Sequence, residues 1–200
     1  MKKMALVVAM TAAILGGCKT TTAYIDATDA TTNIVAALSY ADFSKAANEM
    51  ADEIIASKLM THPQADVGGR YIVYVSDIEN DTMQRIDTDQ LTKGLRVNLL
   101  NSGKFLVTTA FGEDDTTTKM RSLKDSKMVK QSSVKGDNAV LAPDFSLSGK
   151  IIQRNTTLDN DDTRIEYYFQ LSMTNLENGL AYYEGERVVG KVADGASVSW

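Results

Sequence analysis

The feature that most constrains the fold is a segment, residues 165–174, in which apolar and polar positions alternate without a break. One side consists of Ile165, Tyr167, Phe169, Leu171 and Met173. The other side consists of Glu166, Tyr168, Gln170, Ser172 and Thr174. Because successive side chains of a strand point to opposite faces of its sheet, this period of two predicts a long β-strand. It also predicts a sheet that is covered on one side more than on the other.

Strand patterns flank this segment on both sides. Phe145, Leu147 and Ile151 alternate before it, and residues 180–191 are expected to form a last strand after it. The polar residues 155–162 and the dipeptide Asn178-Gly179 stand where hairpin turns belong. The last third of the chain is therefore predicted to form an antiparallel meander.

The last predicted strand contains a glycine and two adjacent tyrosines. Gly185 indicates a bend or a bulge at that point. Tyr182 and Tyr183 cannot both face inward on one regular strand, which makes one of them a candidate exposed contact. We favour core packing or an aromatic edge contact over such a role.

The first half of the chain shows helical periodicity in two places. The first apolar stripe is formed by Phe43, Ala47, Met50 and Ile54. Its cap is expected at Ser39 or Asp42. The second helix is expected to begin near Thr88, with Asp87 or Thr88 as its cap, and its stripe is Leu91, Leu95 and Leu99. Gly103 is expected to end it in the left-handed conformation.

Each of these helices is followed by a short apolar run. Residues 71–75 suit a strand buried on both faces, and residues 105–109 a second strand. The polar residues 77–84 are expected to form a loop, and residues 114–135 to be helical in part. The predicted fold is a single α/β domain of three layers, with a mixed sheet of about five strands, helices packed on it and a C-terminal antiparallel meander.

The N-terminus has the pattern of a bacterial lipoprotein leader. Lys2 and Lys3 precede an uncharged, mostly apolar run that is too short to span a membrane, which indicates a signal peptide over residues 1–17. The sequence Leu15-Gly-Gly-Cys18 resembles a lipobox, in which the cysteine is acylated and becomes the first residue of the mature protein. We therefore predict a palmitate-bearing membrane anchor at Cys18, outside the cytoplasm.

A flexible tether is expected to join this anchor to the folded part. Residues 18–38 are rich in Thr, Ala and Asp and contain too few large apolar groups to order themselves. About 20 residues reach at most about 70 Å when taut and about 25–30 Å when relaxed. Residues 39–200 are predicted to form the domain.

The composition and the motifs of the chain argue against several classes of function. The formal net charge of −5 becomes −7 when Lys2 and Lys3 leave with the signal peptide, so nucleic acid is not an expected partner. Cys18 is the only cysteine, which excludes a disulfide or thiolate metal site in the domain. His62 stands beside Pro63 and is expected to be a solvated side chain in a loop. No HExxH, GxSxG or phosphate-binding glycine loop occurs, so we expect no enzyme activity, no metal and no cofactor.

One stretch of the sequence has the opposite charge to the rest. Between residues 119 and 135 a single acid, Asp125, stands among six cations: Lys119, Arg121, Lys124, Lys127, Lys130 and Lys135. Such a run is usually only a solvated face, but its sign and its poor core patterning favour a surface that steers an acidic partner. We predict that Lys119, Arg121, Lys124, Lys127 and Lys130 form the partner-binding surface.

Three blocks of the sequence resemble the LpoB family, whose members are outer-membrane lipoproteins that activate class A penicillin-binding proteins. These blocks are the helix at residues 40–50, residues 75–80 together with 91–105, and residues 144–149 with the hairpin at 169–191 behind them. The resemblance implies a domain like the N-terminal domain of TolB. It further implies a periplasm-facing protein of the outer membrane that works in peptidoglycan synthesis and cell shape by docking onto the periplasmic domain of a penicillin-binding protein.

The tether departs from the family pattern, since wall-crossing members have long, Pro-rich tethers and this chain has no proline before Pro63. An alternative function is that of an accessory lipoprotein of an outer-membrane secretion or assembly system. Curli-export lipoproteins share related strand and helix blocks, but they carry additional amphipathic hairpins that are not found here. An enzyme acting on cell-wall material is the least favoured reading.

Overall fold

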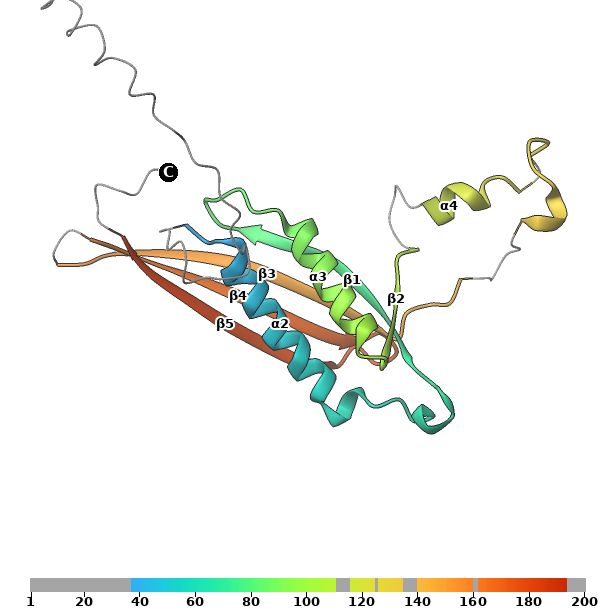
Figure 1. Ribbon diagram of the computed structural model, residues 1–200, viewed down its shortest axis with the longest axis horizontal. Coiled ribbons are helices and arrows are strands. Elements are labelled where there is room, and N and C mark those ends of the chain that lie inside the picture. The colour runs from blue at the N-terminus through green and yellow to red at the C-terminus, as the bar shows by residue number, and fades with distance from the viewer. Residues whose placement is uncertain (1–36, 111–115, 125, 135–139, 160–161, 194–200) are drawn as a thin grey trace, which may run out of the picture.

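A computed structural model shows a mixed five-stranded sheet with helices on it (Figure 1). The structure describes residues 37–110, 116–124, 126–134, 140–159 and 162–193. The strands, in chain order, are β1 (Tyr71–Asp81), β2 (Phe105–Thr108), β3 (Phe145–Thr157), β4 (Thr163–Asn175) and β5 (Ala181–Ala193). They lie in the order β2-β1-β3-β4-β5, in which β1 runs parallel to both neighbours and β3, β4 and β5 form an antiparallel meander. The predicted fold class is thereby confirmed.

Helices α2 (Tyr40–Ala56) and α3 (Thr88–Asn101) lie side by side on one face of this sheet (Figure 1). The side chains between helices and sheet are almost completely buried and include Met50, Ile54, Leu95, Leu99, Leu147, Ile151, Leu171 and Met173. Burial of each such side chain stabilises the fold by about 1.5–3 kcal/mol. The described elements thus form two layers, where the sequence analysis expected three, because both long helices cover the same face.

The predicted helix ends are confirmed in detail. Ser39 caps α2: its hydroxyl accepts the N–H of Asp42 at 3.4 Å, and the Asp42 carboxylate accepts the N–H of Ser39 at 2.8 Å. These reciprocal bonds form a capping box. Asp87 caps α3 by accepting the N–H of Gln90 at 3.2 Å. Gly103, just beyond the helix, has a φ of +70°, which is the left-handed conformation that the sequence analysis expected.

Strand β1 continues through residues that were expected to form a loop. A shift in its pairing with β3 between Val75 and Ile78 places Ile78 on the covered face, where it is buried. Beyond it, Lys150 of β3 forms ion pairs with Glu79 at 3.1 Å and Asp81 at 2.9 Å on the other face. The loop assignment failed because charged side chains can occupy a strand whose outer face is open to solvent.

Residues 71–75 of this strand were expected to be buried on both faces of the sheet. Val73 and Val75 are buried, but Ile72 and Tyr74 between them are only partly buried. Strand β1 is therefore buried on one face, not on both.

The two adjacent tyrosines of β5 both pack inward. The pairing of β4 with β5 shifts between Met173, which lies opposite Tyr183, and Thr174, which lies opposite Ala181. Tyr182 is the extra residue of this irregularity, so both tyrosines contact the core. The irregularity lies at Tyr182 and not at Gly185, which pairs in regular register.

Gly185 has a different function in the strand. A Cβ atom at this position would lie 2.1 Å from the phenol oxygen of Tyr183. The glycine therefore lets the Tyr183 side chain cross the strand and donate a hydrogen bond to Glu53 of α2 at 2.7 Å. Burial and this hydrogen bond raise the pKa of Tyr183.

Charged side chains hold the edge strand β5 to helix α2. Arg187 forms ion pairs with Glu49 and Glu53. Lys191 lies 2.6 Å from Asp42, and both side chains are only 12% exposed. Burial alone would raise the pKa of Asp42, but the hydrogen bonds from Lys191 and Ser39 outweigh it and lower that pKa below its usual value. The start of α2 is thus fixed to the end of the sheet.

Candidate docking surface

The predicted cations lie on a segment between β2 and β3 that stands apart from the sheet. This segment, the basic arm, comprises residues 116–124 and 126–134. It contains the short helix α4 (Thr116–Arg121) and a 3-10 turn at Gln131–Ser133. Figure 1 shows α4 beyond the end of β2, away from helices α2 and α3. Its position explains why no apolar stripe could be found in this part of the sequence.

Hydrogen bonds between near neighbours hold the basic arm in shape. The side-chain amide of Gln131 donates to the carbonyl oxygens of Leu123, Ser126 and Val129, and Leu123 is the most distant of these three, eight residues away. Ser133 donates to the carbonyl oxygen of Lys130 at 2.6 Å. The shape of the arm therefore follows from local contacts.

All five predicted cations lie on this arm. Lys119, Lys124, Lys127 and Lys130 are exposed, whereas Arg121 is half-buried. Lys135 lies outside the described residues, as does Cys18. The placement is compatible with the predicted docking surface.

Two methionines give the basic arm an apolar component that the sequence analysis did not use. Met120 is 57% exposed and Met128 is 88% exposed. Flexible, polarizable methionines adapt to partner surfaces of irregular shape. Positive charge next to exposed methionine is suited to binding an acidic protein surface, where the charges speed encounter and the apolar groups add contact area.

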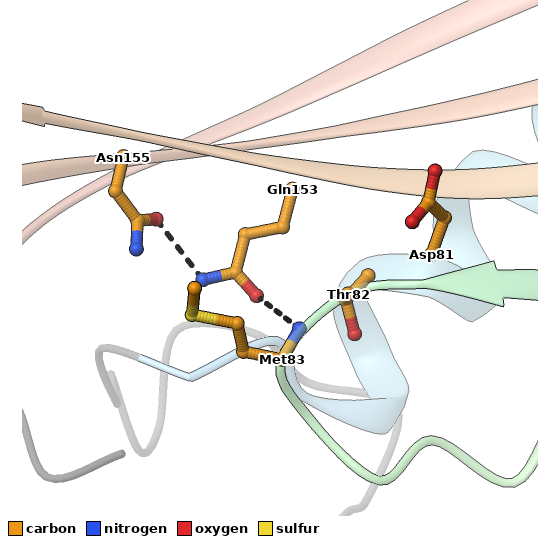
Figure 2. A pocket seen from close by; sticks show the side chains of 5 residues that line it. All are labelled: Asp81, Thr82, Met83, Gln153 and Asn155. Atoms are coloured by element: carbon orange, nitrogen blue, oxygen red, sulfur yellow. Dashed lines mark hydrogen bonds between the residues drawn. The ribbon is translucent and has the colours of Figure 1, made fainter.

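A hollow of about 470 Å³ lies where β1 ends beside β3, and Figure 2 shows its lining. Gln153 accepts the backbone N–H of Met83 at 3.1 Å and donates to Asn155 at 3.0 Å. Thr82 and Asp81 complete the lining. The groups in this hollow are amides, one carboxylate and one hydroxyl, so its chemistry suits hydrogen bonding to a partner.

The face of the sheet that the described helices leave uncovered carries the polar side of β4, which was predicted from the sequence but not considered there as a contact surface. Tyr168 of β4 lies opposite Ile152 of β3 and Val188 of β5. The guanidinium carbon of Arg154 lies 5.3 Å from the centre of the Tyr168 ring. The signal was present, because the alternation that places Tyr167 and Phe169 in the core also places Tyr168 on the opposite face.

Among the residues that the structure describes, no group of three or more histidine, cysteine or acidic side chains is placed to hold a metal ion. Within the same ranges, no helix combines the length and the apolar content needed to cross a bilayer.

The chain is similar to the solved C-terminal domain of LpoB from Salmonella enterica, with 14% identity, 74% of this chain and 98% of that chain covered, and a TM-score of 0.47. The C-terminal domain of LpoB from Escherichia coli is 14% identical, with 75% of this chain and 99% of that chain covered and a TM-score of 0.43. The lipoprotein GNA1162 from Neisseria meningitidis is 12% identical, with 61% of this chain and 83% of that chain covered and a TM-score of 0.37. No curated protein matches the chain.

The sequence also matches a protein-family model, described as peptidoglycan-synthase activator LpoB, over residues 42–189. The match begins in the first turn of α2 and ends in β5, so it includes both long helices and all five strands. It covers more than half of the chain and confirms the resemblance noted in the sequence. The chain belongs to the LpoB family of peptidoglycan-synthase activators.

Proposed function

We propose that this protein is a lipid-anchored activator of a peptidoglycan synthase. It is held to the outer membrane by Cys18, faces the periplasm, and binds the periplasmic domain of a class A penicillin-binding protein without catalysing a reaction of its own. The observation that carries this proposal is the family match over residues 42–189. The lipobox at Leu15-Gly-Gly-Cys18 supports the anchor.

Activation by binding requires that the protein prefer one state of the synthase. A bound protein shifts a conformational equilibrium only by its difference in affinity for the two states. A tenfold preference for the active state corresponds to about 1.4 kcal/mol. A docking surface of moderate size can supply this difference, so no catalytic group is needed.

The basic arm is the proposed contact with the synthase. Its cations are placed on one exposed segment, opposite in sign to the acidic chain as a whole. Clustered charge raises the rate of encounter with an oppositely charged surface, and added salt weakens this effect. The partner surface is therefore expected to be acidic.

The tether limits where the contact occurs. Its roughly 20 residues reach at most about 70 Å from the lipid anchor. The synthase must therefore present its docking domain within that distance of the anchoring membrane. A synthase whose periplasmic domain ends farther away would not be activated by the anchored protein, even if it binds the detached chain.

The proposal is tested with the full chain in a non-ionic maltoside detergent and a purified class A penicillin-binding protein from the same cell. We expect binding with a Kd between nanomolar and micromolar values and faster glycan polymerisation when the protein is added. The variant Lys124→Glu/Lys127→Glu should stimulate less. Its matched control is Lys58→Glu/Lys93→Glu, which reverses two exposed cations outside the arm and should stimulate like the unmodified protein.

The anchor and the partner class are tested in cells. Labelled palmitate should be incorporated into the protein and not into a Cys18→Ser variant, and the labelled protein should fractionate with the outer membrane. Crosslinking followed by mass spectrometry should recover a penicillin-binding protein. Recovery of secretion or assembly components in its place, together with no effect on polymerisation, would overturn the proposed function.

A further inference from the structure

A small cavity of about 200 Å³ lies at the end of the sheet where β1 and β2 begin. It is open to solvent and is bordered by the chain between α2 and β1, including the 3-10 turns at Lys58–Met60 and Ala65–Val67, and by the turn that leads into β2. Its polar lining comes from Thr61, His62, Arg70 and Lys104 together with backbone at three glycines. The cavity lies apart from the basic arm and from the hollow of Figure 2.

The charged lining of this cavity has a single sign. Arg70 and Lys104 carry permanent positive charges, His62 adds an imidazole, and no aspartate or glutamate is among the described residues that line it. Lys104 donates one hydrogen bond to the carbonyl oxygen of Ile55 at 2.6 Å, which leaves two of its three N–H groups for other partners. Positive charge gathered in this way is unexpected in an acidic protein.

The histidine is held in a fixed position. Its Nδ1 accepts the backbone N–H of Gln64 at 3.0 Å, so the neutral ring carries its proton on Nε2 and that nitrogen is a donor. The ring packs against Tyr71 with 4.8 Å between ring centres. A Cβ atom at residue 69 would lie 2.3 Å from Nδ1, so the chain needs Gly69 to pass the ring. His62 is therefore a half-buried side chain held by Gln64 and Tyr71 at the edge of this cavity.

We propose that this cavity binds a phosphate group. Every charged or titratable lining group can donate a hydrogen bond, and arginine offers the planar fork that pairs with two phosphate oxygens. Free phosphate, like a phosphate monoester, carries about −1.5 to −2 charges at pH 7, and the phosphodiester of a phospholipid headgroup carries about one; either is attracted by the positive charges of Arg70 and Lys104. Pockets for drug-sized ligands measure about 300–1,000 Å³. The cavity is smaller than these, and its volume suits a single phosphate group. The source is either free phosphate or the headgroup of a phospholipid.

The test is an NMR titration. The chain has a single histidine, so the ring nitrogen signals need no further assignment. The full chain, labelled with ¹⁵N at histidine, is kept in maltoside detergent and titrated with sodium phosphate at constant ionic strength. We expect the ring nitrogen signals of His62 to shift along a saturable curve. Arg70→Gln, a change at an exposed side chain, should weaken binding tenfold or more while the melting temperature stays unchanged.

The matched control is Arg85→Gln, because Arg85 is also exposed but lines a different hollow together with Asp87 and Asp89. This variant should bind phosphate like the unmodified chain. Equal weakening in both variants would indicate general charge attraction and overturn the proposal. Sodium acetate binding as tightly as phosphate would also overturn it.

A second titration separates the two sources of phosphate. Glycerophosphoglycerol, the deacylated headgroup of phosphatidylglycerol, is compared with inorganic phosphate under the same conditions. Tighter binding of the former supports a lipid headgroup, and tighter binding of the latter supports free phosphate. Binding of neither compound would overturn the proposal, and none of these results depends on whether the protein activates a synthase.

Discussion

The sheet with its two long helices and the basic arm are built by different kinds of contact. In the former, β3 pairs with β1 and β4 along most of its length, and side chains such as Leu147 and Met173 are fully buried. In the basic arm, the hydrogen bonds that Gln131 donates to three backbone carbonyls span eight residues or fewer, and Met128 is 88% exposed. The stability of the protein therefore resides in the sheet and helices, and the arm can vary its surface at little cost to the fold.

The largest expected difference between the two regions is in response to truncation. Leu147→Ala should lower the free energy of unfolding by about 2–5 kcal/mol, because it leaves a cavity in a close-packed core. Met128→Ala should change that free energy by less than about 0.5 kcal/mol, because little of its surface is buried. Urea unfolding followed by circular dichroism measures both values. A comparable loss for the two variants would mean that the arm packs on the fold.

The next effect concerns the ion pair that fixes the start of α2. Lys191→Met removes the charge opposite Asp42 but keeps most of the aliphatic stem, and should cost about 1.5–3 kcal/mol at pH 7. Because the pKa of Asp42 is lower in the folded state, the carboxylate stabilises the fold above its unfolded pKa of about 4. This stabilisation is lost as the pH falls through the folded pKa. The difference between variant and unmodified protein should therefore shrink below about pH 4, and a constant difference would contradict the assignment.

A smaller effect is expected from the glycines of β5. Gly185→Ala should cost about 1 kcal/mol, because the new Cβ would displace the Tyr183 side chain and its hydrogen bond to Glu53. Gly190→Ala is the matched control, since its Cβ would meet no atom within 4 Å. Thermal unfolding of the two variants gives the comparison. Equal melting temperatures would show that the Tyr183 contact contributes nothing.

The smallest effect on stability, and the largest on association, is expected in the basic arm. Lys124→Glu/Lys127→Glu should leave the free energy of unfolding within about 0.5 kcal/mol of the original value. Association with the synthase should become slower and less sensitive to salt, since encounter depends on the charge that is reversed. Surface plasmon resonance at several salt concentrations measures both quantities. Unchanged kinetics would exclude the arm as the docking surface.

Local patterns in the sequence were sufficient to predict most of the helices and strands. The strict alternation at residues 165–174 predicted β4, and the caps at Ser39 and Asp87 predicted where two helices begin. Each of these signals depends on residues within a few positions of one another. The same holds for the basic arm, whose charge and lack of an apolar stripe are visible without a structure.

Features that depend on pairing between distant segments could not be predicted from local sequence patterns. The extension of β1 to Asp81 depends on its pairing with β3, and the inward packing of both Tyr182 and Tyr183 depends on where β4 meets β5. The cavity at His62 was missed for the same reason. Arg70 and Lys104 are brought beside this histidine only by the turns that end in β1 and β2.

By itself the sequence determined the periodicity of strands and helices, their caps, the charge of the arm and the resemblance to the LpoB family, because hydrophobic spacing and capping act over a few residues. Only the tertiary structure decided that both long helices cover one face, that β1 runs on through a polar segment, and that three basic side chains meet in one cavity. Those outcomes follow from strand register and from packing between residues far apart in the chain, and no local pattern encodes them.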